Sequence, residues 1–425
     1  MDTTPLAKPS RSRLIAASIG VAVFLGLVWF IWGQTASIKV AENDWPWWRG
    51  SNHNNIGTGD AATEWSESKN IRWKSDVPGR GHGSPIVVGT SVYLASADDL
   101  TKTLSLYSFD RATGEPKWET PLTSGEAMHK SIKNTYASSS PACDGSSIFY
   151  PWISDQQLWL ASVSVDGTLN WKKPIAPFIS EHGYGSSPCL YQSLVIIPGD
   201  NLGTSYLTAV DRQTGNIVWQ TQRSAGGSYT SPVIHPSAGR SQLIMSGQNS
   251  VVSYHPATGE VLWQCEGPGL STIGTASFND RLAFFTCGAS PMIAGVMAIE
   301  MNSGKIVWQA DAMANVPSSL LVDDSLLVAE DRGTLVCYDA NSGQKKWKER
   351  IGGNLSASPV AVGDKVFLPQ ESGIVSVFEV GDSLKRIAEN DLGDGGFASP
   401  VIIGGEMFLR TEHFLYCIAN DPLAD

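Results

Sequence analysis

The chain has 425 residues, a formal net charge of −11 and a sequence pI near 5.1. This acidic balance argues against nucleic acid or an anionic lipid surface as the main partner. Charged residues make up only 17% of the chain. The part that follows the N-terminal segment, roughly 350 residues, is long enough to bury a core without a metal or disulfide framework.

The N-terminal segment has the pattern of a membrane anchor. Lys8, Arg11 and Arg13 precede an uncharged stretch, Leu14 to Gly33, whose 20 residues match the hydrocarbon core of a bilayer. Basic residues before this stretch and acidic residues after it place the N-terminus inside and the rest of the chain outside.

We therefore expect residues 1–13 to be a cytoplasmic basic segment and residues 14–33 to be a transmembrane helix or signal anchor. The protein would cross the cytoplasmic membrane once, with its folded part on the extracytoplasmic (periplasmic) side. A cleavage site near Thr35-Ala-Ser37 leaves an alternative open, which is secretion after signal cleavage.

Tryptophan then recurs along the chain with a period near 45 residues. Most copies end a phrase of an acidic or polar residue, a turn closing with glycine, three residues and Trp, as in Asp211-Arg-Gln-Thr-Gly-Asn-Ile-Val-Trp219. Such a period with short apolar runs predicts a β-propeller in which each repeat is one four-stranded blade. A large aromatic residue on each outer strand would pack between neighbouring blades. The seven structural blade tryptophans are Trp73, Trp118, Trp171, Trp219, Trp263, Trp308 and Trp347.

A second mark, a Ser-Pro or similar small pair, opens each repeat. The openings are Ser84-Pro85, Ser140-Pro141, Ser187-Pro188, Ser231-Pro232, Ala276-Ser277, Ser318-Ser319, Ser358-Pro359 and Ser399-Pro400. Proline is tolerated at the first position of a strand, because its missing N–H lies at the end of the ladder.

Eight openings face only seven tryptophans, and this mismatch predicts how the ring closes. The last repeat has three strands, whereas the segment Asn70–Trp73 precedes the first opening and has no blade of its own. We expect this segment to be the outer strand of the last blade, which removes open strand edges. Residues 34–64 would be an extracytoplasmic linker or extension. Residues 65–425 would form an all-β, eight-bladed propeller of antiparallel blades.

The loops before the openings crowd one end of the central channel in such a ring. They carry glycine, aromatic residues and a few cations, which suit a sugar, an aromatic group or an anion. The alternative is that these side chains only plug the channel. The candidate ligand-binding residues at this channel mouth are Arg80, His82, Lys133, Tyr136, His182, Tyr184, Tyr229 and Phe397.

The chain contains no Ser-His-Asp grouping and no histidines at metal-ligand spacing. We therefore expect no catalytic residues and no metal ligands.

The phrase Ala-Thr-Gly-x-x-x-Trp after a Leu-x-x-Asp strand resembles the repeat of the pyrroloquinoline-quinone (PQQ)-like propellers, over roughly residues 65 to 420. That family contains quinoprotein dehydrogenases, the BamB-like scaffold of outer-membrane β-barrel assembly, and envelope proteins of unassigned function. The opening Trp45-Pro-Trp-Trp-Arg-Gly-Ser-Asn52 is similar to the last group.

The dehydrogenase branch of this family has an adjacent Cys-Cys disulfide on the quinone and calcium held by Glu, Asn and Asp. No two cysteines are adjacent in this chain. The resemblance therefore implies a membrane-anchored, non-catalytic binding or assembly scaffold in the cell envelope, without a cofactor. It would act as a monomer whose partners are cell-envelope proteins or a small polar or aromatic ligand. The alternative is a PQQ-dependent dehydrogenase that oxidises an alcohol or sugar with PQQ and Ca²⁺.

Overall fold

The computed structural model of the chain describes residues 37–123, 129–237, 239–267, 269, 272–287 and 295–420. Residues Lys39–Asp425 form one compact unit. The segment 14–33, predicted to cross a membrane, lies outside the described residues. No helix long and apolar enough to span a bilayer occurs in the part of the chain that is described.

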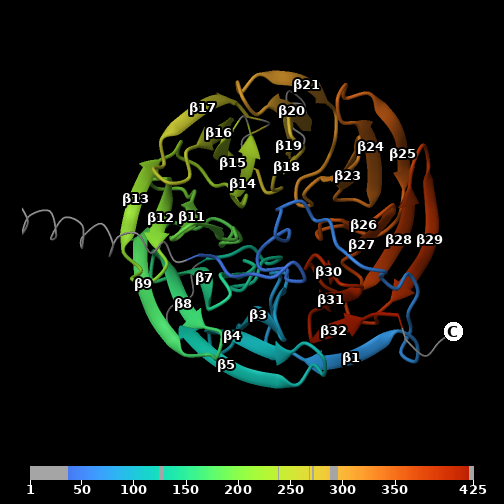
Figure 1. Ribbon diagram of the computed structural model, residues 1–425, viewed down its shortest axis with the longest axis horizontal. Coiled ribbons are helices and arrows are strands. Elements are labelled where there is room, and N and C mark those ends of the chain that lie inside the picture. The colour runs from blue at the N-terminus through green and yellow to red at the C-terminus, as the bar shows by residue number, and fades with distance from the viewer. Residues whose placement is uncertain are drawn as a thin grey trace, which may run out of the picture. The chain divides into compact units, whose positions relative to one another are not determined.

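The described strands form eight sheets of four strands each, arranged as blades around a central axis in chain order (Figure 1). The prediction of an eight-bladed, all-β propeller is confirmed. Within a blade, consecutive strands pair antiparallel from the axis outward, as β10, β11, β12 and β13 do in the third blade.

The four strand positions of a blade differ in length. The innermost strands are β2 (Ile86–Val88), β6 (Ala142–Cys143), β10 (Cys189–Tyr191), β14 (Val233–Ser237), β18 (Ser277–Phe278), β22 (Leu320–Val322), β26 (Val360–Val362) and β30 (Val401–Ile403). The second strands are β3 (Ser91–Asp98), β7 (Ser147–Ser154), β11 (Leu194–Gly199), β15 (Arg240–Gly247), β19 (Leu282–Thr286), β23 (Ser325–Glu330), β27 (Lys365–Pro369) and β31 (Glu406–Arg410).

The outer half of each blade has longer strands on average than the inner edge. The third strands are β4 (Thr103–Asp110), β8 (Gln157–Ser164), β12 (Tyr206–Asp211), β16 (Ser250–Tyr254), β20 (Val296–Glu300), β24 (Thr334–Asp339), β28 (Ile374–Val380) and β32 (Phe414–Ile418). The outer strands are β1 (Ile71–Asp76), β5 (Pro116–Thr123), β9 (Leu169–Pro177), β13 (Ile217–Gln222), β17 (Val261–Glu266), β21 (Ile306–Ala310), β25 (Lys345–Arg350) and β29 (Leu384–Asp391).

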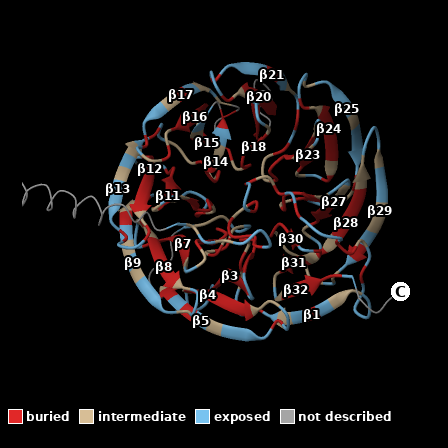
Figure 2. Cartoon of the chain, in the orientation of Figure 1, coloured by how far each residue is buried: buried red, intermediate tan, exposed pale blue. Residues whose placement is uncertain are grey.

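The sequence of each strand follows its radial position. Inner and middle strands have neighbouring blades on both faces, so they are continuous apolar runs, and all six residues of β11 are buried. Outer strands alternate because one of their faces meets water, and β13 has the sequence Ile-Val-Trp-Gln-Thr-Gln with only Trp219 and Thr221 partly covered. Figure 2 shows this gradient as a buried interior inside an exposed rim.

Both ends of the described chain contribute to the eighth sheet, whose strand order is β1-β32-β31-β30. In the antiparallel pairing of β1 with β32, Trp73 lies opposite Cys417 and Asp76 lies opposite Phe414. The segment that carries the first repeat tryptophan is therefore the outer strand of the last blade. This position pairs a strand edge of β32 that would otherwise be exposed.

Each repeat tryptophan contacts the turn of the next blade. The indole N–H of Trp73 donates to the carbonyl of Arg111 at 3.0 Å, and that of Trp308 donates to Ala340 at 2.9 Å. The glycine of the receiving turn is required by both conformation and space. Gly114 has a φ of 75°, and a Cβ there would lie 2.6 Å from the Trp73 ring.

The same glycine–indole contact recurs around the ring. A Cβ on the turn glycine would lie within 2.5–2.8 Å of the tryptophan of the preceding blade in each pair. The pairs are Gly114 with Trp73, Gly167 with Trp118, Gly215 with Trp171, Gly259 with Trp219, Gly304 with Trp263 and Gly343 with Trp308. Within one repeat phrase, therefore, the glycine contacts the tryptophan of the blade before, and the tryptophan contacts the turn glycine of the blade after.

Replacing Trp73 by alanine should destabilise the ring, because it removes a buried indole and its hydrogen bond from the junction of the eighth and first blades. We expect a loss of about 3–5 kcal/mol in the free energy of unfolding, measured by urea denaturation. Lys69→Ala, on the exposed turn before β1, is the control and should stay within about 0.5 kcal/mol of the wild type. A Trp73 variant as stable as the control would contradict this role for β1.

Candidate functional site

The segment that precedes the first blade, residues 39–62, lies across the central channel, and we call it the plug (Figure 1). It contacts blades on several sides of the ring. Trp45 exchanges two backbone hydrogen bonds with Val87 of β2, at 2.7 and 3.0 Å. On another side, the side-chain amide of Asn55 donates to the carbonyl of Pro359 at 3.1 Å. The predicted linker is thus a packed part of the domain.

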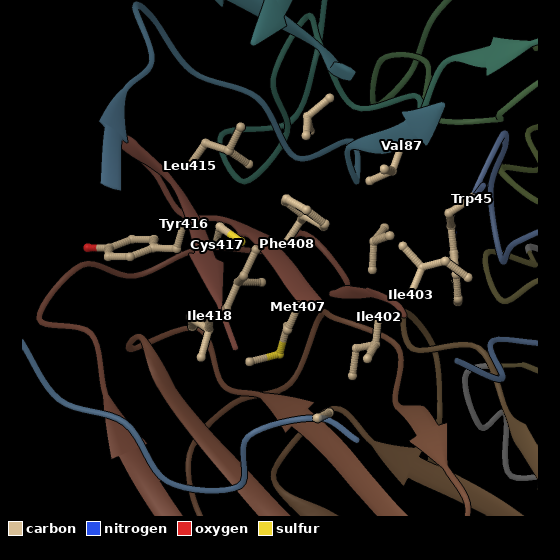
Figure 3. Packing of buried hydrophobic residues seen from close by; sticks show 14 of the residues in the cluster. Trp45, Val87, Ile402, Ile403, Met407, Phe408, Leu415, Tyr416, Cys417 and Ile418 are labelled. Carbon is tan, nitrogen blue, oxygen red and sulfur yellow. The ribbon is translucent and has the colours of Figure 1, made fainter. Parts of the chain in front are cut away.

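The plug is anchored by buried side chains. Figure 3 shows Trp45 beside Val87, close to Ile403 of β30, within one continuous apolar cluster. Arg49 is fully buried, with Nε donating to the carbonyl of His53 and Nη2 donating to the carbonyl of Ser319, both at 3.0 Å. Burial lowers the pKa of Arg49 to about 9. A buried guanidinium held by two carbonyl groups fixes the path of the plug across the axis.

A belt of eight hydroxyl groups surrounds the axis where the innermost strands begin. In seven steps the backbone N–H of one member donates to the hydroxyl oxygen of another member, at 2.8–3.0 Å. The step from Ser399 to Ser84 joins the last blade to the first. The hydroxyl belt consists of Ser84, Ser140, Ser187, Ser231, Thr275, Ser318, Ser358 and Ser399.

The belt corrects the repeat register in the fifth blade. The sequence pattern placed the opening at Ala276-Ser277, whereas the structure puts Thr275 in the position that serine occupies elsewhere. Thr275 keeps the donor half of this role, because its backbone N–H donates to the hydroxyl oxygen of Ser318 at 2.9 Å. The hydroxyl oxygen of Thr275 accepts a hydrogen bond from the indole N–H of Trp48 at 3.0 Å. Trp48 thereby ties the plug to the belt.

The belt, the plug and the loops before the innermost strands enclose a cavity of about 400 Å³, which we call the cup. It is lined by Trp48, His82, Ser84, Ser131, Lys133, Asn134, Ser138, Ser140, His182, Gly185, Ser187, Tyr229, Ser231, Ile273, Thr275, Val316, Ser318, Ser356, Ser358, Phe397 and Ser399. A volume of this size suits a small molecule of the kind that binds in enclosed, mostly apolar sites.

Five of the eight candidate residues at the channel mouth line this cup: His82, Lys133, His182, Tyr229 and Phe397. The rings of His82 and Phe397 stack with centroids 4.2 Å apart and an interplanar angle of 30°. Lys133 Nζ lies 5.7 Å from the Phe397 centroid and 2.7 Å from a carboxylate oxygen of Glu371. His182 and Tyr229 form a second, tilted pair with centroids 6.0 Å apart.

The other three candidates lie outside the cup. Arg80 forms an ion pair with Glu412 at 2.9 Å. The Tyr136 ring lies under the ammonium group of Lys130. The side chain of Tyr184, a candidate either for contact with a ligand or for plugging the channel, is buried, and its hydroxyl donates to the carbonyl of Pro198 at 2.9 Å. Counting residues back from the opening serine predicts which loop a candidate belongs to. The conformation of that loop decides whether its side chain enters the cup.

Two side chains of the mouth, His82 and Tyr229, are electrically neutral. Burial, followed by the positive charges of Arg80, Arg410, Lys130 and Lys133, lowers the pKa of His82 to about 3. The imidazole ring therefore stays uncharged at neutral pH.

Tyr229 is likewise neutral, because burial and the nearby Glu181 carboxylate raise its pKa to about 12. Ile273, Val316 and Ser356 also line the cup. The lining of the cup thus combines aromatic residues with small aliphatic and hydroxyl side chains.

Sequence reasoning missed two parts of the site, Trp48 and the belt as a whole. Trp45-Pro-Trp-Trp48 packs three indoles into four residues of a segment assigned as a linker. A solvated linker has no use for such apolar area, so this density was a signal for burial. The serines were recognised as repeat marks, but their common direction toward the axis follows only from the closed ring.

The residues of the cup do not fit a calcium-bound quinone. Calcium takes about six to eight oxygen ligands, commonly from carboxylates. No described residue that lines the cup is Asp or Glu. Nor does the described part of the chain contain a group of three or more His, Cys, Asp or Glu residues able to hold a metal ion. Trp48 supplies an aromatic surface, but the carboxylate ligands of the dehydrogenase branch have no counterparts among the described residues of the cup.

The fold and the cup define the class: an eight-bladed PQQ-like β-propeller whose channel is crossed by its own N-terminal segment. The pattern of the family described as outer membrane protein assembly factor BamB matches residues 55–180, 137–283 and 293–386. The chain belongs to this family.

Comparison with individual proteins gives the same class. The outer membrane protein assembly factor BamB of Yersinia pestis is 21% identical over 346 residues, covering 78% of this chain and 82% of that protein. The crystal structure of BamB from Moraxella catarrhalis is similar with a TM-score of 0.61 at 13% identity, covering 84% of this chain and 98% of that chain.

A dehydrogenase structure is similar to the same degree. Quinohemoprotein alcohol dehydrogenase ADHIIG from Pseudomonas putida HK5 has a TM-score of 0.66 at 13% identity, covering 90% of this chain and 81% of that chain. At such identities the likeness shows a shared fold and does not distinguish scaffold from enzyme.

The plug predicts a pH dependence of stability. Burial lowers the pKa of His53 to about 4, and that of His82 is lowered as well. The unfolded chain takes up these protons near pH 6.5 and the folded protein does not, so stability is highest above about pH 6.5 and falls toward pH 4. The free energy of unfolding should therefore be lower at about pH 5 than at about pH 7.5.

His53→Asn should reduce this loss, since asparagine does not titrate and tolerates the φ of 54° at this position. His413 is the matched control, because it is exposed and Asp394 raises its pKa. His413→Asn should keep the full loss between the two pH values. An unchanged pH dependence in His53→Asn would show that this histidine is not buried in its neutral form.

Proposed function

We propose that the protein is a non-catalytic binding or assembly scaffold of the cell envelope, anchored in the cytoplasmic membrane by residues 14–33 with its propeller in the periplasm. Membership of a family described as an outer membrane protein assembly factor supports this proposal. The basic residues before the apolar stretch and the acidic residues after it support the orientation.

One observation carries the scaffold proposal: exposed apolar side chains gather on the face of the ring that holds the mouth of the cup. Leu100 and Ile132 are each 94% exposed, Ile179 is 53% exposed and Leu202 is 52% exposed. They belong to consecutive blades, the first to the third, and Ile132 lies between Ser131 and Lys133 of the cup. We call these four residues the apolar platform. Exposed apolar residues gathered on one face of a protein are a feature of protein-binding surfaces.

The loops that carry the platform are joined to one another. The backbone N–H of Leu202 donates to the carbonyl of Ile179 at 3.3 Å. The loop of Ile132 is joined to that of Ile179, because Ser180 Oγ donates to the carbonyl of His129 at 2.6 Å. A platform held in place before binding loses little conformational entropy when a partner docks. This arrangement supports the proposal that the platform binds a protein partner.

The alternative function, a PQQ-dependent dehydrogenase, finds less support in the site. The quinone would supply the two-electron oxidation of an alcohol or sugar, but the described residues of the cup include no carboxylate to hold Ca²⁺ or to act as a base. Reconstitution with PQQ and Ca²⁺ tests this alternative directly. Quinone-dependent alcohol oxidation with a dye acceptor would overturn the scaffold proposal.

A double substitution, Ile132→Asp with Ile179→Asp, should abolish partner binding, because it places two carboxylates in the centre of an apolar interface. The measurement is capture of the full-length tagged protein after cross-linking in its native envelope. We expect the major cross-linked protein to fall at least about tenfold.

The control for this experiment is Ile217→Asp with Val218→Asp, since both side chains are about half exposed on the outer strand β13. This variant should retain the cross-linked partner. Equal capture by both double variants, or no specific partner with the wild type, would refute a partner surface at the platform.

The anchor is tested separately by fractionation. About 20 apolar residues span a bilayer, so the full-length protein should remain with membranes through high-salt and carbonate washes. Mass spectrometry of its N-terminus should find the chain uncut. Recovery of a soluble form that begins near Ala36 to Glu42 would show instead that the segment is a cleaved signal.

A further inference from the structure

The hydroxyl belt leaves one proton on each of its members without an acceptor among the described residues. A hydroxyl group has one O–H donor and two lone pairs. In seven members the oxygen accepts the backbone N–H of another belt residue, and in Thr275 it accepts the indole N–H of Trp48. None of the eight O–H groups donates a hydrogen bond to another described residue. The remaining donors therefore have to find an acceptor inside the cup.

These donors are shielded from bulk water. Each belt residue is at most 6% exposed, and all eight line the cup. A buried hydroxyl that makes no donor bond costs free energy, so a ring of them favours an occupant rich in acceptor oxygens.

The rest of the lining supplies few acceptors. Among the described residues of the cup there is no Asp or Glu. The side-chain oxygen of Asn134 already accepts the backbone N–H of Thr135 at 2.8 Å and the hydroxyl of Ser138. Glu371 lies near the rim, but its carboxylate accepts hydrogen bonds from Lys133 and Ser356, both at 2.7 Å. The cup thus offers donors in excess and few acceptors.

The excess of hydrogen-bond donors over acceptors in the cup favours some classes of ligand over others. A neutral sugar brings as many O–H donors as acceptors, and its donors would find few partners in this lining. A doubly charged inorganic anion would need several cations, whereas Lys133 is the sole Lys or Arg among the described lining residues and is paired with Glu371. One carboxylate matches the site, because a single charge can be shared among several neutral O–H donors.

The upper part of the cup fits the other end of such a ligand. Phe397, Tyr229, Ile273 and Val316 line the cup together with the belt. Phe397 precedes the eighth blade and Tyr229 the fourth, so these two residues come from opposite sides of the ring. An aromatic or aliphatic body between them would bury apolar area on both faces.

We propose that the cup binds a small organic monocarboxylate, with its carboxylate at the hydroxyl belt and its apolar body among Phe397, Tyr229, Ile273 and Val316. This site is separate from the apolar platform, so it adds a ligand to the scaffold and does not depend on the protein partner.

The probe for this proposal is benzoate, compared with its neutral relatives benzamide and benzyl alcohol. The full-length protein in detergent is titrated and followed by ligand-detected NMR and calorimetry. We expect saturable binding of benzoate at one site, with benzamide and benzyl alcohol weaker by at least about tenfold. No saturable binding of benzoate, or equal binding of benzamide, would overturn the proposal and leave water as the acceptor for the belt.

Two pairs of variants locate the site. Val316 is only partly buried, so Val316→Asp and Val316→Asn should both fold, yet only the aspartate repels an anion. Benzoate binding should vanish in Val316→Asp and persist within about threefold in Val316→Asn. Equal loss in both variants would refute a charged ligand in the cup.

The second pair tests the belt. Ser140→Ala removes one belt hydroxyl and should weaken benzoate binding by about three- to tenfold. Ser139→Ala is the control, since Ser139 is equally buried but its hydroxyl donates to the carbonyl of Ser186 outside the lining. Equal binding by the two serine variants would overturn the role of the belt. Benzoate titration and partner cross-linking are separate measurements on the same protein, which separates failure of this proposal from failure of the scaffold.

Discussion

The structure depends on how eight blades satisfy their backbone groups where they converge on the axis. The innermost strands begin close together, with no space for a further strand to accept their first N–H groups, and a buried unpaired N–H is costly. The hydroxyl belt solves this locally, because each serine offers its oxygen to the N–H of another blade. Proline often follows, and it has no N–H to satisfy. The opening pair of a repeat thus serves to satisfy the backbone N–H groups at the axis.

The rim of the ring is held by a second kind of contact, between tryptophan and glycine. Blades diverge with distance from the axis, so the outer strands need a large side chain to fill the widening space. The indole of Trp308 does this and also donates to the carbonyl of Ala340 in the next blade. The turn glycine, Gly343, makes room for that ring and accepts the left-handed backbone. Each repeat therefore has to meet two independent requirements: a hydroxyl residue at the axis, and a tryptophan and a turn glycine at the rim.

The plug gives this ring its particular chemistry. By crossing the channel between β2 and β26 it turns a passage into a cup with Trp48 in its lining. Its buried Arg49 and neutral His53 hold the segment in place. The apolar platform lies beside the mouth of the cup, on hydrogen-bonded loops of the first three blades. A protein partner docked there would stand next to the entrance of the cup.

The sequence alone determined the eight blades, the paired repeat marks and the loops that surround the channel mouth, because each is a local pattern repeated at a fixed period. It also gave five of the eight candidate residues that line the cup. It could not place Tyr184, whose hydroxyl reaches the carbonyl of Pro198, because the loop conformation decides which way that side chain faces. It missed the plug for a related reason. The segment around Trp48 belongs to no repeat, and its position is set by contacts with residues such as Thr275 and Ser319, which lie more than 200 positions away in the chain. Periodic neighbours are encoded locally, whereas a single crossing of the axis is decided only when the ring has closed around it.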